Sequence, residues 1–330
     1  MNECELMAAI PGRTFSPDTD APGEGRERLL GALLLLDEAG YDFVPPTPAT
    51  QRRQMTRAGR QRAASLIDVL GWSLPVEPGV IEPALENALI DAGVLTRTED
   101  DRLKPLLRAS RVEGLLFWHS PYPTRERNAV FLGPDTYRFA QFILARMPDN
   151  PKTILDYGAG AGVGGILAAR RVASALLTIA DINPLALYLA SINAEHAGVE
   201  HQVVSVSRPA EFEDARFDLI VSHPPFMIDS EHRLYRDGGD LYGARLSLQW
   251  LVEGTYLLAP GGRLIMHTGS SVVMGQDVLK SAIADASLAD NITVDYRELD
   301  PDIFGNELGK MEYAEVERIA AVGIVAQSGI

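Results

Sequence analysis

The 330-residue sequence has a single cysteine, Cys4, so it can build neither a disulfide framework nor a thiolate metal site. Its six histidines do not occur at H-E-x-x-H or a comparable spacing, and we therefore expect no bound metal. No apolar run approaches the roughly 20 residues of a membrane-spanning helix, and residues 1–11 lack the features of a secretory signal. These absences predict a globular protein of the cytoplasm.

Basic residues are also scarce, because 30 Lys and Arg stand against 45 Asp and Glu, a formal charge of −15. This balance argues against binding duplex nucleic acid over the whole surface, since Lys and Arg must neutralise the phosphates. Residues 43–67 differ from this acidic composition, because they contain five arginines and no Asp or Glu. On a helix Arg53, Arg57 and Arg60 would share one face. That face has three open interpretations: solvated surface, polyanion contact, or a domain or dimer contact.

The N-terminal third predicts a leader and an accessory domain. Residues 1–25 are expected to be a disordered leader, because residues 11–25 are rich in Pro, Gly, Thr and Asp. Helical patterns follow at 26–39, 48–71 and 82–92. Short apolar runs then predict strands at 94–97, 103–110 and 114–119, the first two forming a hairpin. Helices followed by a small hairpin predict a helical, winged-helix-like domain over residues 26–125.

From Asn128 onward, patterns typical of strands and helices alternate. The expected strands are 153–157, 176–181, 202–206, 217–222, 262–268, 292–298 and 316–326. The expected helices are 135–147, 162–172, 184–197, 240–258 and 273–287. This alternation predicts an α/β domain over residues 128–330 with a doubly wound sheet, whose ligands bind at the carboxyl ends of the strands.

A glycine-rich loop follows the first of these strands, with the sequence Asp156-Tyr-Gly158-Ala-Gly160-Ala-Gly162. Glycines let the backbone turn sharply and approach a ligand, and the next helix points its N-terminal N–H groups at that ligand. Asp181 ends the second strand, where a carboxylate can accept both ribose hydroxyls of an adenosine. Because Gly160 to Gly165 also fits G-x-G-x-x-G, a nicotinamide dinucleotide stays open at this point.

A second loop follows the fourth strand, where Phe217–Ser222 leads into His223-Pro224-Pro225-Phe226. Consecutive prolines fix φ and remove N–H donors, so the carbonyls before them are free to face a substrate. The later segment Tyr235-Arg-Asp-Gly-Gly239 predicts either a substrate-contacting lid or a surface turn with an Arg236–Asp237 ion pair.

Together the two loops resemble the small-domain, N-P-P-[YF]-type class I S-adenosylmethionine-dependent methyltransferases, which include release-factor glutamine and rRNA guanine N-methyltransferases. The signatures of that group are D-x-G-x-G-x-G and N-P-P-[YF], and the resemblance covers roughly residues 131–325. It implies a Rossmann-like sheet of seven strands with the last one antiparallel. It also implies S-adenosylmethionine as the cofactor, which Asn183-Pro184 and the proline loop favour over a dinucleotide.

The resemblance assigns roles to individual residues. Asp156 is implied at the amino-acid end of the cofactor, and Thr136 in a loop that covers its methionine part. Thr136 is equally expected to be the N-cap of the following helix. The other implied cofactor-binding residues are Gly158, Gly160, Gly162, Asp181 and Asn183.

One residue departs from the pattern, because His223 stands where the group has Asn. In that group the Asn side chain and the next carbonyl accept N–H groups of the substrate, and the aromatic stacks on it. Pro224, Pro225 and Phe226 fit these catalytic positions. An imidazole offers one donor and one acceptor and titrates near neutrality. His223 therefore has three open interpretations: a hydrogen bond to a nitrogen acceptor, a general base, or loop packing. The other histidines are expected to be structural or exposed.

The sequence thus predicts a cytoplasmic methyltransferase that methylates a planar nitrogen on a protein side chain or a small metabolite. One alternative is an RNA base N-methyltransferase that uses the arginine-rich N-terminal helix. Another is a non-catalytic adenosyl-ligand or dinucleotide-binding protein. The sequence gives no adenine-contacting residue, no membrane partner and no oligomeric state.

Overall fold

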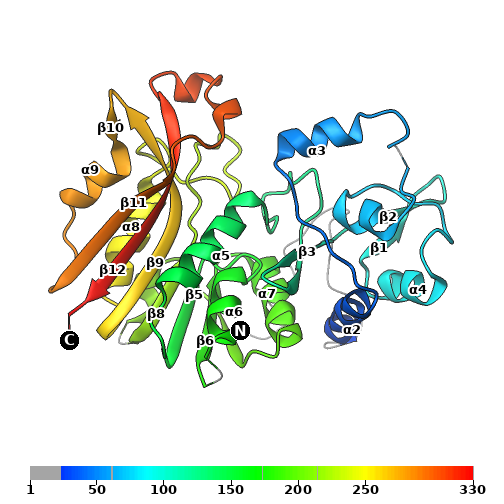
Figure 1. Ribbon diagram of the computed structural model, residues 1–330, viewed down its shortest axis with the longest axis horizontal. Coiled ribbons are helices and arrows are strands. Elements are labelled where there is room, and N and C mark those ends of the chain that lie inside the picture. Colours follow the sequence, from blue (N-terminus) through cyan, green and yellow to red (C-terminus); the bar gives the residue numbers. More distant parts are fainter. Residues whose placement is uncertain (1–23, 61, 173, 214, 330) are drawn as a thin grey trace.

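The computed structural model describes residues 24–329, except for positions 61, 173 and 214. The predicted leader lies outside this range apart from residues 24 and 25, which begin the first described helix, α2 (Glu24–Glu38). A part with short helices and hairpins stands beside a larger part built on a twisted sheet (Figure 1).

The large sheet follows the predicted alternation. Its long strands are β5 (Thr153–Tyr157), β6 (Leu176–Asp181), β7 (His201–Ser205), β8 (Phe217–Ser222), β9 (Leu258–Val273), β11 (Ile292–Asp300) and β12 (Arg318–Ser328). They lie in the order β11-β12-β9-β8-β5-β6-β7, and β10 (Gln276–Asp277) pairs with β9. Neighbours from β7 to β9 are parallel, whereas β12 runs antiparallel between β9 and β11. The predicted fold class, with an antiparallel last strand, is confirmed.

Helices cover both faces of this sheet (Figure 1). On β8, Leu219 and Val221 pack in one buried cluster and Ile220 in the other, as the alternation of a strand requires. The first cluster includes residues of α5 (Pro134–Arg146), α6 (Val163–Arg170) and α7 (Pro184–His196). The second includes residues of α8 (Arg245–Thr255) and α9 (Val278–Ala284), two helices that are shorter than predicted because β9 and the loop after β8 take up the flanking residues.

The strand order places the two predicted loops together. The chain runs from β5 outward to β6 and β7 and then returns to β8 on the other side of β5. In an open α/β sheet, ligands bind at such a switch point, outside the carboxyl ends of the strands. The glycine loop follows β5 and the proline loop follows β8, so both lie at this crevice.

The N-terminal part differs from the prediction in two places. Its elements are α2, α3 (Pro48–Met55), a π-helical turn (Ile67–Gly71), α4 (Pro83–Asp91), β1 (Leu95–Arg97), β2 (Leu103–Pro105), β3 (Arg108–Val112) and β4 (Leu115–His119). The single helix predicted over 48–71 is wrong, because the chain leaves helical geometry after Met55 and Gly59 has a φ of +80°. Arg53, Arg57 and Arg60 therefore do not share one helix face.

The predicted hairpin region is also divided differently. β1 pairs with β2, but β4 pairs with β3 in a separate two-stranded sheet. The run predicted as one strand over 103–110 breaks after Pro105, a residue that cannot donate to a strand ladder.

The N-terminal part packs directly on α7. Trp118 of β4 is fully buried, and its indole N–H donates to the carbonyl of Leu29 over 3.1 Å. Asn193 of α7 accepts the Trp118 N–H over 2.8 Å and donates to the Trp118 carbonyl over 3.1 Å. The same amide donates to the carbonyl of Ala161 in the glycine loop over 2.9 Å. Residues on both sides of the predicted boundary near 125 thus belong to one buried cluster.

Among the helices in the described part of the chain, none is long and apolar enough to cross a bilayer.

Candidate functional site

The glycine loop has the backbone geometry that its sequence predicts. Gly158, Gly160 and Gly162 have φ angles of +67°, +56° and +80°, in the left-handed region that other residues rarely adopt. A Cβ at Gly158 would lie 2.5 Å from the ring of Trp250. Gly162 is the N-cap of α6, so the helix begins directly at the crevice with its first N–H groups unshared by helical partners.

Asp156 fastens this loop to the sheet. Its side chain is buried, and Oδ2 accepts the N–H of Gly165, at the start of α6, over 2.8 Å. Burial raises the pKa of Asp156 to about 7, and the nearby charge of Asp181 acts in the same direction, against the Gly165 bond. Its contact with the amino-acid end of a cofactor stays a prediction.

Asp181 connects the glycine loop to α7. One carboxylate oxygen accepts the N–H of Gly160 over 2.9 Å, and the other accepts the N–H of Asn183 over 2.8 Å. Burial raises the pKa of Asp181, opposed by these backbone hydrogen bonds. A carboxylate has about four acceptor positions, so Asp181 keeps capacity to accept a further hydroxyl group. Asn183 caps α7 by accepting the N–H of Leu185 over 3.1 Å.

Sequence reasoning missed the residue after this acid. Ile182 is 52 % exposed although it is a large apolar side chain, and it directly follows the ribose-compatible carboxylate. An exposed apolar residue at a ligand crevice offers a surface for a flat ring. Its position next to Asp181 was the available signal.

Thr136 lies at the start of α5, but the expected N-cap role is wrong. Gly133 is the N-cap, and the helix begins at Pro134. Thr136 occupies the third helical position, where its hydroxyl accepts the N–H of Gly133 over 3.3 Å. It therefore stabilises the helix start from inside the first turn.

The proline loop is held between strands. The hydroxyl of Ser222 donates to the carbonyl of Tyr157 over 2.9 Å, which ties the end of β8 to the end of β5. Pro224 and Phe226 are buried, whereas His223 and Pro225 are partly exposed. The ring of Phe226 packs over Gly269, where a Cβ would lie 2.2 Å from it. Since this ring is largely covered by the protein, its stacking on an acceptor stays a prediction.

His223 has a partner that the sequence prediction did not anticipate. The parallel register sets Ser222, the last residue of β8, beside Met266 in the interior of β9, so the next residues, His223 and His267, are neighbours. His223 Nε2 lies 3.3 Å from His267 Nδ1, with the rings nearly perpendicular at 88°. Burial lowers the pKa of His223 to about 4. His267 is fully buried, and burial, His223 and Arg138 hold its pKa well below the usual range.

The segment after the proline loop packs behind it. The N–H of Met227 donates to the carbonyl of Arg236 over 3.0 Å, and the N–H of Gly238 donates to the carbonyl of Met227 over 2.8 Å. The proposed Arg236–Asp237 ion pair is not formed. Arg236 pairs instead with Glu307 at 2.7 Å, and Asp237 lies 2.5 Å from His232.

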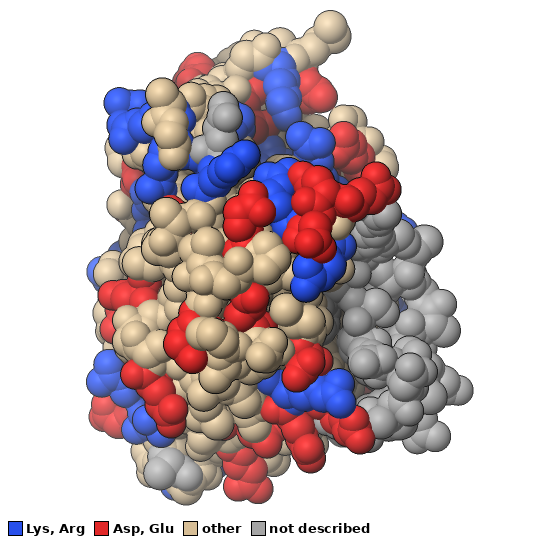
Figure 2. Space-filling model, turned by 90° about the vertical axis from the view of Figure 1, so that its right-hand side faces the viewer, with Lys and Arg blue, Asp and Glu red and all other residues tan. Residues whose placement is uncertain are grey.

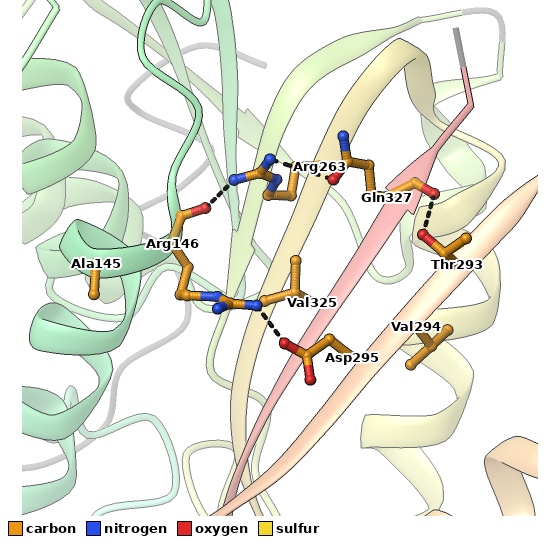
Figure 3. A pocket seen from close by; sticks show the side chains of 8 residues that line it. All are labelled: Ala145, Arg146, Arg263, Thr293, Val294, Asp295, Val325 and Gln327. Atoms are coloured by element: carbon orange, nitrogen blue, oxygen red, sulfur yellow. Dashed lines mark hydrogen bonds and ion pairs between the residues drawn. The ribbon is translucent and has the colours of Figure 1, made fainter.

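A cavity of about 380 Å³ lies elsewhere, near the start of β9 and the end of β12 (Figure 3). The side chains that line it contact one another, since Arg146 pairs with Asp295 and Arg263 donates to the Arg146 carbonyl and to Gln327. It occupies the end of the sheet opposite the two loops, so it is not the candidate site. Within the described residues, no cluster of three or more His, Cys, Asp or Glu is arranged to hold a metal.

The chain matches known methyltransferases over the segment that holds both loops. Residues 124–283 match the model of the family described as methyltransferase small domain. The release factor glutamine methyltransferase of Chlorobaculum tepidum is 32% identical over 170 residues, which are 46% of this chain and 56% of that protein. These matches confirm the resemblance to small-domain S-adenosylmethionine-dependent methyltransferases and the cofactor that it implies.

The names of two further relatives specify RNA. The tRNA1(Val) (adenine(37)-N6)-methyltransferase of Glaesserella parasuis is 28% identical over 158 residues, 46% of this chain and 63% of that protein. The ribosomal RNA small subunit methyltransferase C of Hahella chejuensis is 32% identical over 127 residues, 38% of this chain and 34% of that protein. The chain thus spans less than two thirds of each of these three relatives.

Proposed function

We propose that this protein transfers a methyl group from S-adenosylmethionine to a nitrogen of a planar group, on a protein side chain or a small metabolite. The observation that carries this proposal is the convergence of the glycine loop, Asp181 and the proline loop at one switch point of the sheet. In this arrangement Asp181 accepts the ribose hydroxyls and Ile182 contacts the adenine. The N-terminus of α6 faces the rest of the cofactor.

The reaction is an in-line displacement, in which the bond from sulfur to the methyl carbon breaks as the bond from nitrogen to carbon forms. The protein has to align the acceptor nitrogen with the methyl group and exclude water. The carbonyl of Pro224 accepts no hydrogen bond from the described residues, so it can accept an N–H of the methylated substrate. Phe139 lies with its ring centroid 5.2 Å from that of His223 and shields this loop from one side.

The test uses S-adenosylmethionine carrying a labelled methyl group, with protein, RNA and small-molecule fractions of the source cell as acceptors. We expect the label in the protein or small-molecule fraction, with one S-adenosylhomocysteine formed per methyl transferred. Cofactor binding without transfer to any fraction would instead support the non-catalytic alternative.

The cofactor affinity should depend on pH through Asp156. With a pKa of about 7, this carboxyl is mostly protonated at pH 6 and mostly ionised at pH 8. The ionised form attracts the cationic ligand, so the affinity for S-adenosylmethionine should rise by up to roughly 10-fold between these values. Calorimetry at both pH values measures it. Asp156→Asn keeps an oxygen for the Gly165 N–H and should remove most of the dependence. If the affinity of Asp156→Asn for S-adenosylmethionine varied with pH as in the wild type, Asp156 would not be the titrating group.

The same carboxyl makes a prediction for the unliganded protein. Its folded-state pKa is raised from 3.8 to about 7, so the folded state holds the proton more tightly than the unfolded state. Its contribution to the free energy of unfolding is therefore fully present below about pH 4 and is lost as the pH rises through 7. Urea unfolding should thus show Asp156→Asn gaining stability relative to the wild type between pH 5 and pH 8.

One observation favours RNA as a second candidate acceptor. Arg52, Arg53, Arg57 and Arg62 are exposed and form no ion pair with any described residue. Lys and Arg side chains gather on the upper part of the N-terminal face in Figure 2. Unpaired arginines close together in an acidic protein are suited to contact phosphates.

Hydrogen bonds connect the segment that carries these arginines to the loop after β8. Gln51 of α3 donates to the carbonyl of Trp72 over 2.9 Å, and the neighbouring Ser73 hydroxyl accepts the N–H of Tyr122 over 3.0 Å. The chain then passes the exposed Arg125 and Arg127, and the Thr124 carbonyl accepts the hydroxyl of Tyr235 over 3.0 Å. We propose on this basis that residues 26–125 select the acceptor, whichever class it belongs to.

Replacing Arg53 and Arg57 together by Ala tests the RNA candidate. If each contacts a phosphate, the slope of log affinity against log salt should fall by about 0.7 per contact for single-stranded RNA. The measurement is RNA binding across a salt series. Arg97→Ala with Arg102→Ala is the charge-matched control, because these arginines are paired with Asp101 and Asp100. Equal effects of both variants, or no RNA binding at all, would exclude this candidate. Point variants are preferable to truncation, which would expose Trp118.

A further inference from the structure

One ring nitrogen of His267, Nε2, has no hydrogen-bond partner among the described residues. The imidazole is fully buried, and Nδ1 faces His223. A buried ring that shares only one of its two nitrogens has two neutral tautomers. Either Nδ1–H donates to His223 and Nε2 is a bare lone pair, or Nε2–H is a buried donor with no acceptor.

The cost of an unpaired buried donor selects between these tautomers. Burial, together with the charge of Arg138, keeps the His267 ring neutral. Burial of an N–H that has no acceptor is costly, because the donor gives up its hydrogen bond to water and gains none in the protein. This cost favours the tautomer in which Nδ1 of His267 carries the hydrogen and donates to His223.

We propose that His267 is a positioning residue that donates from Nδ1 to Nε2 of His223, so that His223 carries its hydrogen on Nδ1 and presents an N–H donor to the methyl acceptor. This inference rests on the proposed function. His223 Nδ1 has no partner among the described residues, and His223 is partly exposed at the crevice. An Asn at this position would offer the substrate an acceptor oxygen. In this protein the histidine pair offers the donor N–H of His223 instead.

This arrangement narrows the acceptor chemistry. A substrate that fits offers an N–H to the Pro224 carbonyl and, beside that nitrogen, a carbonyl oxygen or a bare ring nitrogen to His223. Primary amides and purine edges have this pairing, whereas simple amines do not. His223 is then not the base: Nε2 is already accepting a hydrogen bond and Nδ1 already carries a hydrogen. The proton displaced from the acceptor nitrogen goes to solvent water.

The direct test is ¹⁵N NMR of the histidine side chains in the full-length ¹⁵N-labelled protein without any ligand. The signals are assigned by comparing the wild type with His223→Asn and His267→Asn. We expect His223 and His267 to carry their hydrogens on Nδ1. Observation of His223 with its hydrogen on Nε2 would overturn the proposal. The NMR measurement requires no substrate. Its outcome is therefore independent of whether the methyl-transfer assay detects activity.

Variants of His267 give the kinetic test. His267→Asn places an amide N–H where Nδ1–H lies and should keep turnover close to that of the wild type. His267→Leu fills similar space without a donor, and kcat should fall by about 10- to 100-fold, as for the loss of other positioning partners. The Kd for S-adenosylmethionine should be unchanged in both. His201→Asn, at a partly exposed histidine on β7, is the control. Equal activity of the Leu and Asn variants would assign His267 a packing role only.

Discussion

Replacing Gly238 by alanine is expected to lower methyl transfer on the order of 100-fold while S-adenosylmethionine still binds. A Cβ at this position would lie 1.9 Å from the carbonyl oxygen of Gly243 and 2.7 Å from the Cα of Phe226. Both contacts are with backbone, so the chain itself has to move. The displaced segment is the proline loop, and a misplacement of about 1 Å at reacting groups can cost 100-fold in rate. Single-turnover kinetics and calorimetry measure the two quantities.

Gly309→Ala is the matched control for Gly238→Ala. Gly309 is exposed in the neighbouring segment before β12, and a Cβ there would meet no atom within 4 Å. It should keep the wild-type rate. A Gly238→Ala protein with wild-type kcat would show that the backbone of the proline loop does not position the acceptor. Thermal unfolding of both variants separates a local displacement from a loss of the fold.

Replacing Asp181 by alanine is expected to raise the Kd for S-adenosylmethionine by about 10- to 100-fold, equivalent to roughly 1.5–3 kcal/mol for lost charged hydrogen bonds. The substitution removes the proposed acceptor for the ribose hydroxyls. It also releases the N–H groups of Gly160 and Asn183, which shape the loop. Calorimetric titration of the variant gives the change directly.

Asp218→Ala separates the two contributions in Asp181→Ala. Asp218 also accepts two backbone N–H groups with one carboxylate, those of Lys152 at 2.7 Å and Thr153 at 3.0 Å. It lies at the amino end of β8, however, away from the crevice. Asp218→Ala should lower the free energy of unfolding and leave the Kd for S-adenosylmethionine unchanged. An equal rise in Kd for both variants would mean that Asp181 acts through loop stability and not through the ligand.

The strands and loops of the large sheet were predictable because their signals are local. β5, β6 and β8 are largely apolar runs. β6 ends at Asp181, and β5 and β8 are followed within two residues by Gly158 and Pro224. Buried parallel strands and the turns after them leave this pattern in a few neighbouring residues. The family resemblance supplied the antiparallel final strand, which no local pattern specifies.

The errors arose where distant residues decide the structure. The helix predicted over 48–71 breaks in part because Arg60 pairs with Asp68 at 3.2 Å and lies 5.5 Å from the ring centroid of Trp72. His267 was expected to be structural or exposed, since its contact with His223, 44 positions away in the sequence, depends on the register between β8 and β9. The ion pair predicted between Arg236 and Asp237 does not form, because the Arg236 guanidinium pairs with Glu307 in a later loop.

The central claim is that the crevice between β5 and β8 binds S-adenosylmethionine. Calorimetric titration of the full-length protein with S-adenosylmethionine, S-adenosylhomocysteine and a nicotinamide dinucleotide tests it most directly. We expect both adenosyl ligands to bind with a stoichiometry near one, with weakened binding in Asp181→Ala, and no binding of the dinucleotide. Binding of the dinucleotide without binding of either adenosyl ligand would contradict the account.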